Sequence, residues 1–97
     1  MTIGEITAVL EKLAPLSLQE DYDNAGLITG NKSSVCTGIL VALDATEAVI
    51  EEAIKQNLNL VVTHHPIVFR GLKKINGNHY VERAIIKAIK NDVALYA

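Results

Sequence analysis

Two adjacent histidines, His64 and His65, stand between an apolar run and a proline. Neutral imidazole is a common protein ligand for zinc, iron, nickel and copper, and a site shared with carboxylates also admits manganese. The preceding run, residues 58–63, is rich in β-branched residues and has the length of a strand buried in a parallel sheet. Because Pro66 has no N–H and disfavours helical backbone before it, the chain leaves the sheet there. The sequence predicts both imidazoles at the carboxyl end of a strand, where α/β proteins gather ligands.

The histidine pair leaves more than one arrangement open. Neighbouring side chains of a strand point to opposite faces, so His64 and His65 converge on one ion only if the backbone turns there. Otherwise each histidine faces its own ion in a two-metal site. The alternative without a metal is that one histidine caps a buried hydrogen-bond network while the other is solvated.

Asp44 follows a second apolar run, residues 39–43, and is expected at the same edge of the sheet. Its carboxylate could ligate a metal, or it could orient a histidine through the ring nitrogen that a metal leaves free. It could instead cap the following helix, although Thr46 competes for that role. The sequence leaves these roles open.

Two further polar groups could reach this edge. Asp23 and Asn24 lie in a polar segment, residues 21–27, whose composition is typical of a turn but whose side chains could extend toward the sheet. Arg70 and Lys73 follow the histidines. They are expected either as a solvated basic loop or as contacts for an anionic substrate such as a nucleotide phosphate.

The elements that must position these residues alternate along the chain. Thr2 and Glu5 have the spacing of a capping box, and apolar residues then recur at helical spacing, which predicts an amphipathic helix over residues 2–14. A brief strand is expected at residues 27–29. After residue 38, strands and helices are predicted in turn at 39–43, 46–56, 58–63, 80–90 and 93–96. This βαβαβ order predicts the α/β class, with a parallel sheet and right-handed crossovers.

The composition narrows the function classes. The chain has 97 residues, enough for one small domain, and 49% of them are hydrophobic, so some apolar surface is expected to meet a partner or a further part of the protein. A net charge of −2 gives no basic field for nucleic acid. The single cysteine and the absence of a leader or of a membrane-length apolar run favour a cytoplasmic protein. No nucleophile elbow, phosphate-binding loop or Cys-x-x-Cys pair occurs.

Three segments occur in a distinctive order: Asp23-Asn24-Ala25-Gly26-Leu27, Leu43-Asp44-Ala45-Thr46 and Val62-Thr63-His64-His65-Pro66. Together they resemble the amino-terminal part of the Nif-three-like family, the dinuclear-metal-centre proteins known as GTP cyclohydrolase I type 2 homologues. The resemblance covers nearly the whole chain. It implies that residues 1–97 are a single amino-terminal α/β portion of a larger Nif-three-like fold.

The resemblance implies that His64 and His65 are ligands of two divalent metal ions, which could be zinc, iron or manganese. It places the turn with Asp23 and Asn24, together with Asp44, near that centre. Family members are longer, and an aspartate, a histidine and a glutamate beyond residue 97 complete their site. The carboxyl-terminal half of the metal site is therefore expected to lie outside this chain, which alone should bind metal weakly and lack catalysis.

Two functions follow from the resemblance. The first is a hydrolase-like protein in which a two-metal centre activates water against an electrophile, with a nucleotide such as GTP as the possible substrate. The second is a metal-binding or protein-interaction module without catalysis. The intact protein is expected to form a homo-oligomer.

Overall fold

The computed structural model describes residues 1–14, 26–65 and 74–97. In chain order, the elements are α1 (Ile3–Leu13), β1 (Leu27–Thr29), β2 (Ile39–Ala42), α2 (Glu47–Lys55), β3 (Leu60–Thr63), α3 (Tyr80–Lys90) and β4 (Ala94–Tyr96). The predicted amino-terminal helix and βαβαβ unit are therefore confirmed. Among the described residues, no helix is long and apolar enough to cross a membrane.

The four strands form one sheet in the order β1-β4-β3-β2. Strands β2, β3 and β4 run parallel, as predicted, with Val41 opposite Val62 and Val62 opposite Tyr96. The brief strand predicted at 27–29 is β1, which joins the far edge antiparallel to β4. Gly26 and Ala97 exchange both backbone hydrogen bonds, at 2.8 and 3.0 Å, and this pairing holds β1 beside the chain's last strand. The sheet is therefore mixed rather than purely parallel.

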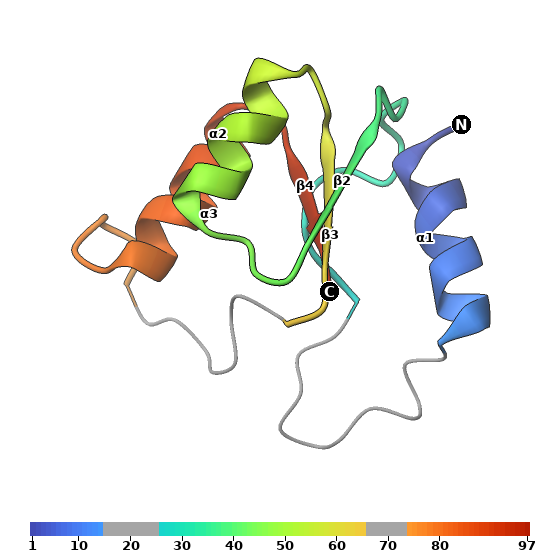
Figure 1. Cartoon of the computed structure of the whole chain (residues 1–97), viewed down its shortest axis with the longest axis horizontal. Helices are drawn as coiled ribbons and strands as arrows, with labels where there is room; N and C mark the ends of the chain where they lie inside the picture. The colour runs from blue at the N-terminus through green and yellow to red at the C-terminus, as the bar shows by residue number, and fades with distance from the viewer. Residues whose placement is uncertain (15–25, 66–73) are drawn as a thin grey trace.

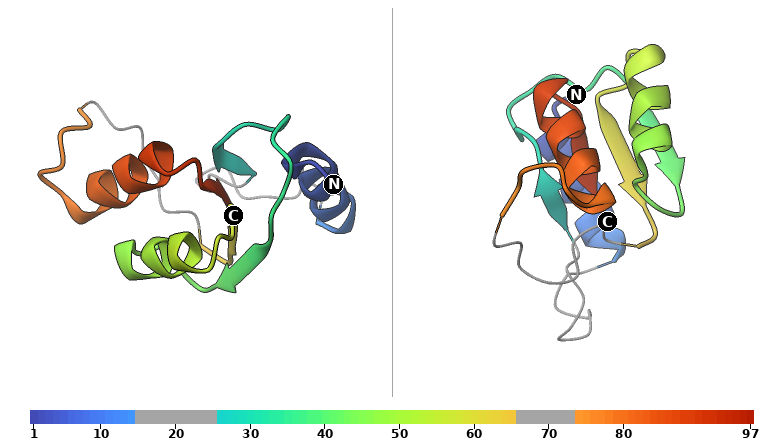
Figure 2. Two further views of the ribbon diagram at one scale, coloured as in Figure 1. Left: turned by 90° about the horizontal axis from the view of Figure 1, so that it is seen from above. Right: turned by 90° about the vertical axis from the view of Figure 1, so that its left-hand side faces the viewer.

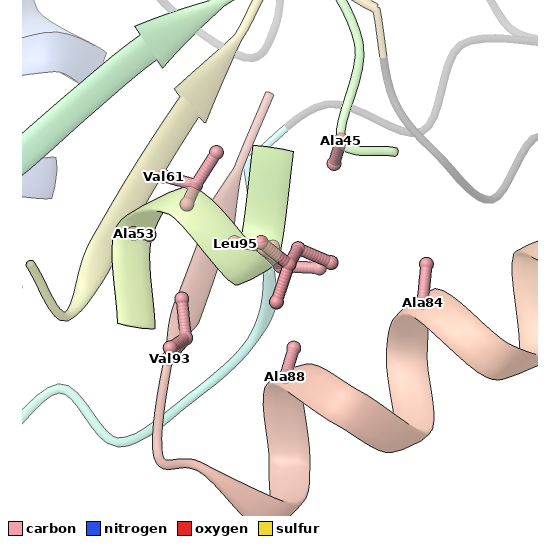
Figure 3. Packing of buried hydrophobic residues seen from close by; sticks show 8 residues of the cluster. Ala45, Ala53, Val61, Ala84, Ala88, Val93 and Leu95 are labelled. Carbon is pink, nitrogen blue, oxygen red and sulfur yellow. The ribbon is translucent and has the colours of Figure 1, made fainter. Parts of the chain in front are cut away.

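Helices cover both faces of the sheet. The two crossover helices α2 and α3 lie side by side on one face, and α1 lies on the opposite face (Figures 1 and 2). The core beneath α2 and α3 is built largely from alanine, valine and leucine (Figure 3). Its members are Ala45, Ile50, Ala53, Val61, Ala84, Ala88, Val93 and Leu95. Small alanines on both helices let them approach the sheet and each other closely.

A smaller cluster holds α1 against the other face. Ile3 is buried there with three sheet residues, Leu60, Ala94 and Tyr96. Burying a side chain such as Ile3 or Leu60 stabilises a fold by about 1.5–3 kcal/mol. Strand β3 contributes to both clusters because its side chains alternate between the faces, so the strand that leads to the histidines is packed on both sides of the sheet.

Each helix starts at a residue whose side chain accepts a hydrogen bond from a backbone N–H of the first turn. Thr2 and Glu5 form the predicted capping box of α1, with the Glu5 N–H donating to Thr2 Oγ1 at 3.2 Å and the Thr2 N–H to Glu5 Oε1 at 3.0 Å. Thr46 accepts from the Val49 N–H at 3.2 Å at the start of α2. His79 accepts from the first turn of α3 through Nδ1 at 3.3 Å.

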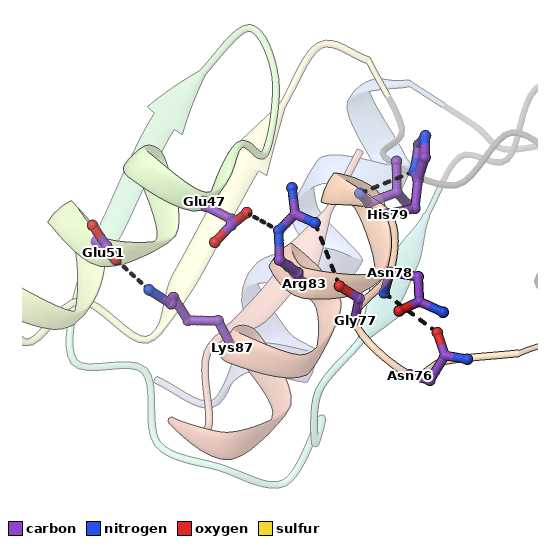
Figure 4. A network of polar contacts seen from close by, with 9 residues as sticks. Glu47, Glu51, Asn76, Gly77, Asn78, His79, Arg83 and Lys87 are labelled. Carbon is purple, nitrogen blue, oxygen red and sulfur yellow. Dashed lines mark hydrogen bonds and ion pairs between the residues drawn. The ribbon is translucent and has the colours of Figure 1, made fainter.

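Two ion pairs join α2 to α3 along their exposed sides (Figure 4). Arg83 Nε lies 2.9 Å from Glu47 Oε1, and Lys87 Nζ pairs with Glu51 Oε1. Exposed pairs of this kind contribute less than about 1 kcal/mol each. They link α2 to α3 over the alanine-rich core.

Candidate metal centre

The backbone ladder between β2 and β3 continues past the end of both strands. The His64 N–H donates to the Ala42 carbonyl at 3.2 Å, and the His65 N–H donates to the Leu43 carbonyl at 3.0 Å. These two bonds fix both histidines beside the segment that carries Asp44. The histidines therefore lie at the carboxyl edge of the sheet, as the sequence predicted.

Thr63 closes the turn that follows β3. Its hydroxyl donates to the His65 carbonyl at 2.8 Å, and its side chain is buried. The backbone thus bends immediately after the strand. A bend at this point is what the two neighbouring imidazoles need in order to approach each other. Their ring centroids lie 4.7 Å apart at an interplanar angle of 62°, an edge-to-face arrangement.

Asp44 contacts the second histidine. Its Oδ1 lies 3.0 Å from His65 Nδ1, and Thr46 rather than Asp44 caps α2. A carboxylate that accepts from Nδ1–H fixes the tautomer and the orientation of the ring and leaves Nε2 as the free donor atom. Of the roles that the sequence left open, helix capping falls to Thr46, and Asp44 instead contacts His65.

The pair is largely in solvent, with 52% of the His65 side chain and 60% of the Asp44 side chain exposed. Water screens a contact of this kind, so it adds little to the stability of the fold. Its effect is local, because it holds one imidazole in a defined direction. An exposed pair at a sheet edge is also reachable by ions from solution.

The two imidazoles alone supply fewer ligands than a protein metal site needs. Two imidazole nitrogens suit a borderline divalent ion such as zinc, whose structural and catalytic sites take at least three protein ligands. Within residues 1–14, 26–65 and 74–97, no group of three or more histidine, cysteine, aspartate or glutamate side chains could hold an ion. Among the described residues, the histidine pair therefore falls short of the three protein ligands that such an ion takes.

Four residues that the sequence singled out lie outside the described residues. They are Asp23, Asn24, Arg70 and Lys73. Their expected roles near the metal ions and at an anionic substrate stay predictions.

Beside the histidines lies an open, mainly apolar hollow that the sequence analysis did not identify. Its lining residues are Val41, Ala42, Leu43, Val62, Thr63 and His64. The sequence did contain a signal for this apolar surface, because residues 39–43 are apolar at every position. An edge strand with only one covered face would instead alternate apolar and polar side chains. The hollow gives His64 an apolar neighbourhood, in contrast to His65, which contacts a carboxylate.

Tyr96, expected in the core or at an interface, is buried on β4 against α1. Burial and, to a lesser extent, the negative charge of Glu11 raise the pKa of its phenol above the ordinary value of 10.0. Both causes disfavour the phenolate. Tyr96 is therefore a neutral core residue whose phenol packs on the face of the sheet that carries α1.

The fold and this edge define an α/β protein whose parallel strands present a histidine pair to solvent. The model of the Duf34/NIF3 (NGG1p interacting factor 3) family matches residues 1–97. The chain therefore belongs to the Duf34/NIF3 family, which confirms the resemblance seen in the three sequence segments.

Curated relatives of the chain carry the name GTP cyclohydrolase 1 type 2 homolog. That of Clostridium perfringens is 42% identical over 97 residues, and that of Clostridium acetobutylicum is 39% identical over 97 residues. Both matches cover 100% of this chain but only 37% and 36% of the respective relatives. The chain thus spans just over a third of the length of these proteins.

Solved structures share the fold over the whole chain. Staphylococcus aureus protein SA1388 superposes with a TM-score of 0.95 at 37% identity, with 100% of this chain and 31% of that chain covered. Reduced HcgD from Methanocaldococcus jannaschii gives a TM-score of 0.89 at 30% identity, with 99% of this chain and 38% of that chain covered. The described α/β portion is therefore one part of a larger structure in these relatives.

Proposed function

We propose that this chain forms one side of a two-metal centre in a metal-binding, hydrolase-like protein. The single observation that supports this most is the contact between Asp44 and His65. A carboxylate on Nδ1, beside a second histidine at the carboxyl edge of a parallel sheet, is the arrangement by which proteins prepare an imidazole to bind a metal through Nε2.

Each residue of the edge has a part in this proposal. His64 and His65 hold the ions, Asp44 orients His65, and Thr63 maintains the turn that brings the two rings together. Two divalent ions, whether zinc, iron or manganese, supply the activation of water for attack on an electrophile when they are bound. The open apolar hollow borders the site beside His64.

The substrate that fits the family name is a nucleotide. The curated relatives are called GTP cyclohydrolase homologues, and the proposed anion contacts Arg70 and Lys73 suit a phosphate. The activity belongs to the whole protein, which we expect to act as a homo-oligomer in the cytoplasm. The 97 residues alone bind metal weakly and do not catalyse, because two imidazoles fill only part of a coordination shell.

A calorimetric zinc titration of the 97-residue chain tests the proposal. We expect weak binding that falls further in both His64→Ala and His65→Ala. The third histidine provides a matched control, because His79→Asn keeps a side-chain cap on α3 and lies outside the site. Equal losses in all three variants would mean nonspecific binding to imidazole, and tight binding of two ions would mean that the chain needs no further ligands.

A second function is a metal-binding or protein-interaction module without catalysis. The observation that favours it is the exposed apolar surface of β2, together with a family name that refers to an interaction with NGG1p. A whole protein that binds metal and a stoichiometric partner, yet does not hydrolyse GTP or a phosphoester in the presence of zinc, iron or manganese, would favour this function over the first.

A further inference from the structure

The loop that leads into α3 contains an asparagine followed by a glycine. Asn76 is the only asparagine in the sequence that precedes a glycine, and its side chain is exposed. The side-chain amide of an asparagine can be attacked by the backbone nitrogen of the next residue. Glycine favours this reaction because it has no Cβ beside that nitrogen and its backbone is the least restricted. The geometry of the loop decides whether the reaction can occur in the folded chain.

The Asn76 side chain folds back over the peptide that follows it. Its Oδ1 accepts a hydrogen bond from the Asn78 N–H at 3.3 Å (Figure 4). The ring that this hydrogen bond closes contains both the Asn76 Cγ and the Gly77 N, so the carbon under attack and the attacking nitrogen lie in one tight turn. The same hydrogen bond draws electrons away from Cγ, which makes that carbon a better electrophile.

The backbone nitrogen of Gly77 is available for this attack. Within the part of the chain that the structure describes, the Gly77 N–H donates no hydrogen bond. Gly77 has a φ of 85°, in the left-handed region that glycine adopts without strain. No hydrogen bond therefore has to break, and no side chain has to move, before this nitrogen can react.

The loop is attached to α3 on both sides of the peptide that joins Asn76 to Gly77. The Asn76 N–H donates to Glu82 Oε1 at 2.9 Å, and Arg83 Nη1 donates to the Gly77 carbonyl at 3.4 Å. Glu82 is buried, so its carboxylate accepts from Asn76 in a fixed position. The two hydrogen bonds therefore hold a defined length of main chain against the first turns of α3.

We propose that Asn76 is a site of spontaneous deamidation through Gly77, and that the isoaspartate it yields detaches the loop from the start of α3. The Gly77 N bonds to the Asn76 Cγ, the Cγ–Nδ2 bond breaks, and ammonia leaves with the proton that Gly77 has lost. The product is a five-membered cyclic imide. Water then opens the imide at one of its two carbonyls, which leaves either aspartate or isoaspartate at position 76. This reaction does not depend on metal binding.

The two products differ in their effect on the attachment to α3. Aspartate keeps the length of the main chain and adds one negative charge to the residue that contacts Glu82. Isoaspartate carries the main chain through its Cβ, which adds a methylene between the N–H of residue 76 and the Gly77 carbonyl. The hydrogen bonds to Glu82 and Arg83 cannot then both keep their geometry, so the isoaspartate form should be the less stable product.

Peptide mapping by mass spectrometry, during incubation of the 97-residue chain at constant temperature and pH, tests the proposal. Asn31 is the internal control, because its Oδ1 accepts from the Ser33 N–H at 2.8 Å in the same kind of turn, but the next residue is Lys32. We expect Asn76 to exchange its amide for a carboxylate at least roughly tenfold faster than Asn31. Equal rates at the two asparagines would overturn the proposal.

A substitution at the attacking residue provides a second comparison. Gly77→Ala should slow the conversion of Asn76 by at least about tenfold, because the methyl group hinders the nitrogen. The added Cβ meets only ordinary van der Waals contacts with Arg83 and Ile86, so the variant keeps the fold. An unchanged rate in Gly77→Ala would refute attack by this nitrogen.

A synthetic peptide of residues 74–80 separates the contribution of the fold from that of the local sequence. Asn76 should convert in the folded chain at least as fast as in the peptide. Slower conversion in the chain would mean that the fold protects Asn76, which contradicts the proposal.

The melting temperatures of the separated products test the effect on α3. The isoaspartate form should melt below the variant Asn76→Asp, which carries the added charge without the added methylene. Equal melting temperatures of the two would show that the loop stays attached and would overturn that part of the proposal.

Discussion

Replacement of Asp44 tests whether its carboxylate prepares His65 for a metal. Two variants separate charge from hydrogen bonding. Asp44→Asn keeps an oxygen that can accept from His65 Nδ1, 3.0 Å away, but removes the negative charge. Asp44→Ala removes both. Neither change should alter the start of α2, because Thr46 caps that helix.

The expected magnitude follows from the exposure of the pair. Loss of a partner that orients a metal-binding histidine lowers metal affinity by about 10–100-fold. Because more than half of each side chain is in solvent, we expect the lower end of this range. Asp44→Ala should weaken zinc binding about tenfold, or 1.4 kcal/mol, and Asp44→Asn should weaken it less.

The assay is a competitive zinc titration against a chromophoric chelator at constant pH and ionic strength. Asp92→Asn is the matched control, since it removes the same charge before β4, at the opposite end of the strands. Asp92 has a φ of 53°, a conformation that asparagine tolerates well. An affinity of Asp44→Ala within twofold of the unsubstituted chain would refute the orienting role. A loss of about a thousandfold or more would mean that Asp44 binds the ion directly.

Three further predictions concern the fold. Gly30→Ala should lower the free energy of unfolding in urea by about 2–5 kcal/mol, because φ is 123° and a Cβ would lie 2.5 Å from Ala94 Cβ. Gly77→Ala, with φ of 85° but only ordinary van der Waals contacts for the added Cβ, should lower it by only about 1 kcal/mol. Ile50→Ala should cost about 2–5 kcal/mol in the same assay, since Ile50 is fully buried on the inner face of α2. Above pH 10, Tyr96 ionises in the unfolded chain but not in the folded chain, where its pKa is raised, so the free energy of unfolding should fall as the pH rises further. Tyr96→Phe should flatten this alkaline decline, and an unchanged decline would contradict the prediction.

The helices could be predicted almost to the residue because their ends are marked by local chemistry. The predicted helix 2–14 includes its caps, Thr2 and Ala14, and the predicted helix 46–56 likewise includes Thr46 and Gln56. Side chains that bond to neighbouring backbone groups are visible in the sequence. The difference between prediction and structure is therefore the capping residue at each end.

The strand boundaries and the pairing of the strands were harder to predict from the sequence. The strand predicted from residue 58 begins at Leu60, because the Leu58 N–H still bonds to the Ala53 carbonyl of α2 at 2.8 Å. The antiparallel pairing of β1 depends on contacts with β4, at the other end of the sequence. Pairing over such a separation leaves no local pattern to read.

In the candidate site, too, local features could be predicted from the sequence and long-range contacts could not. The position of the histidines at a strand end could be predicted from the run that precedes them, and Asp44 from the preceding strand. The choice among the roles of Asp44 required the tertiary structure, because Thr46 and Asp44 are both suitable caps by sequence. The position of β2 at the edge of the sheet was also hidden, since sequence does not state which strand lies outermost.

The most direct test of the central claim, that the histidine pair binds metal, is a zinc titration followed by the ring signals of the three histidines in nuclear magnetic resonance spectra. We predict that the signals of His64 and His65 shift together with added zinc and that those of His79 do not. Shifts at all three histidines alike, or none at His64 and His65, would contradict the claim.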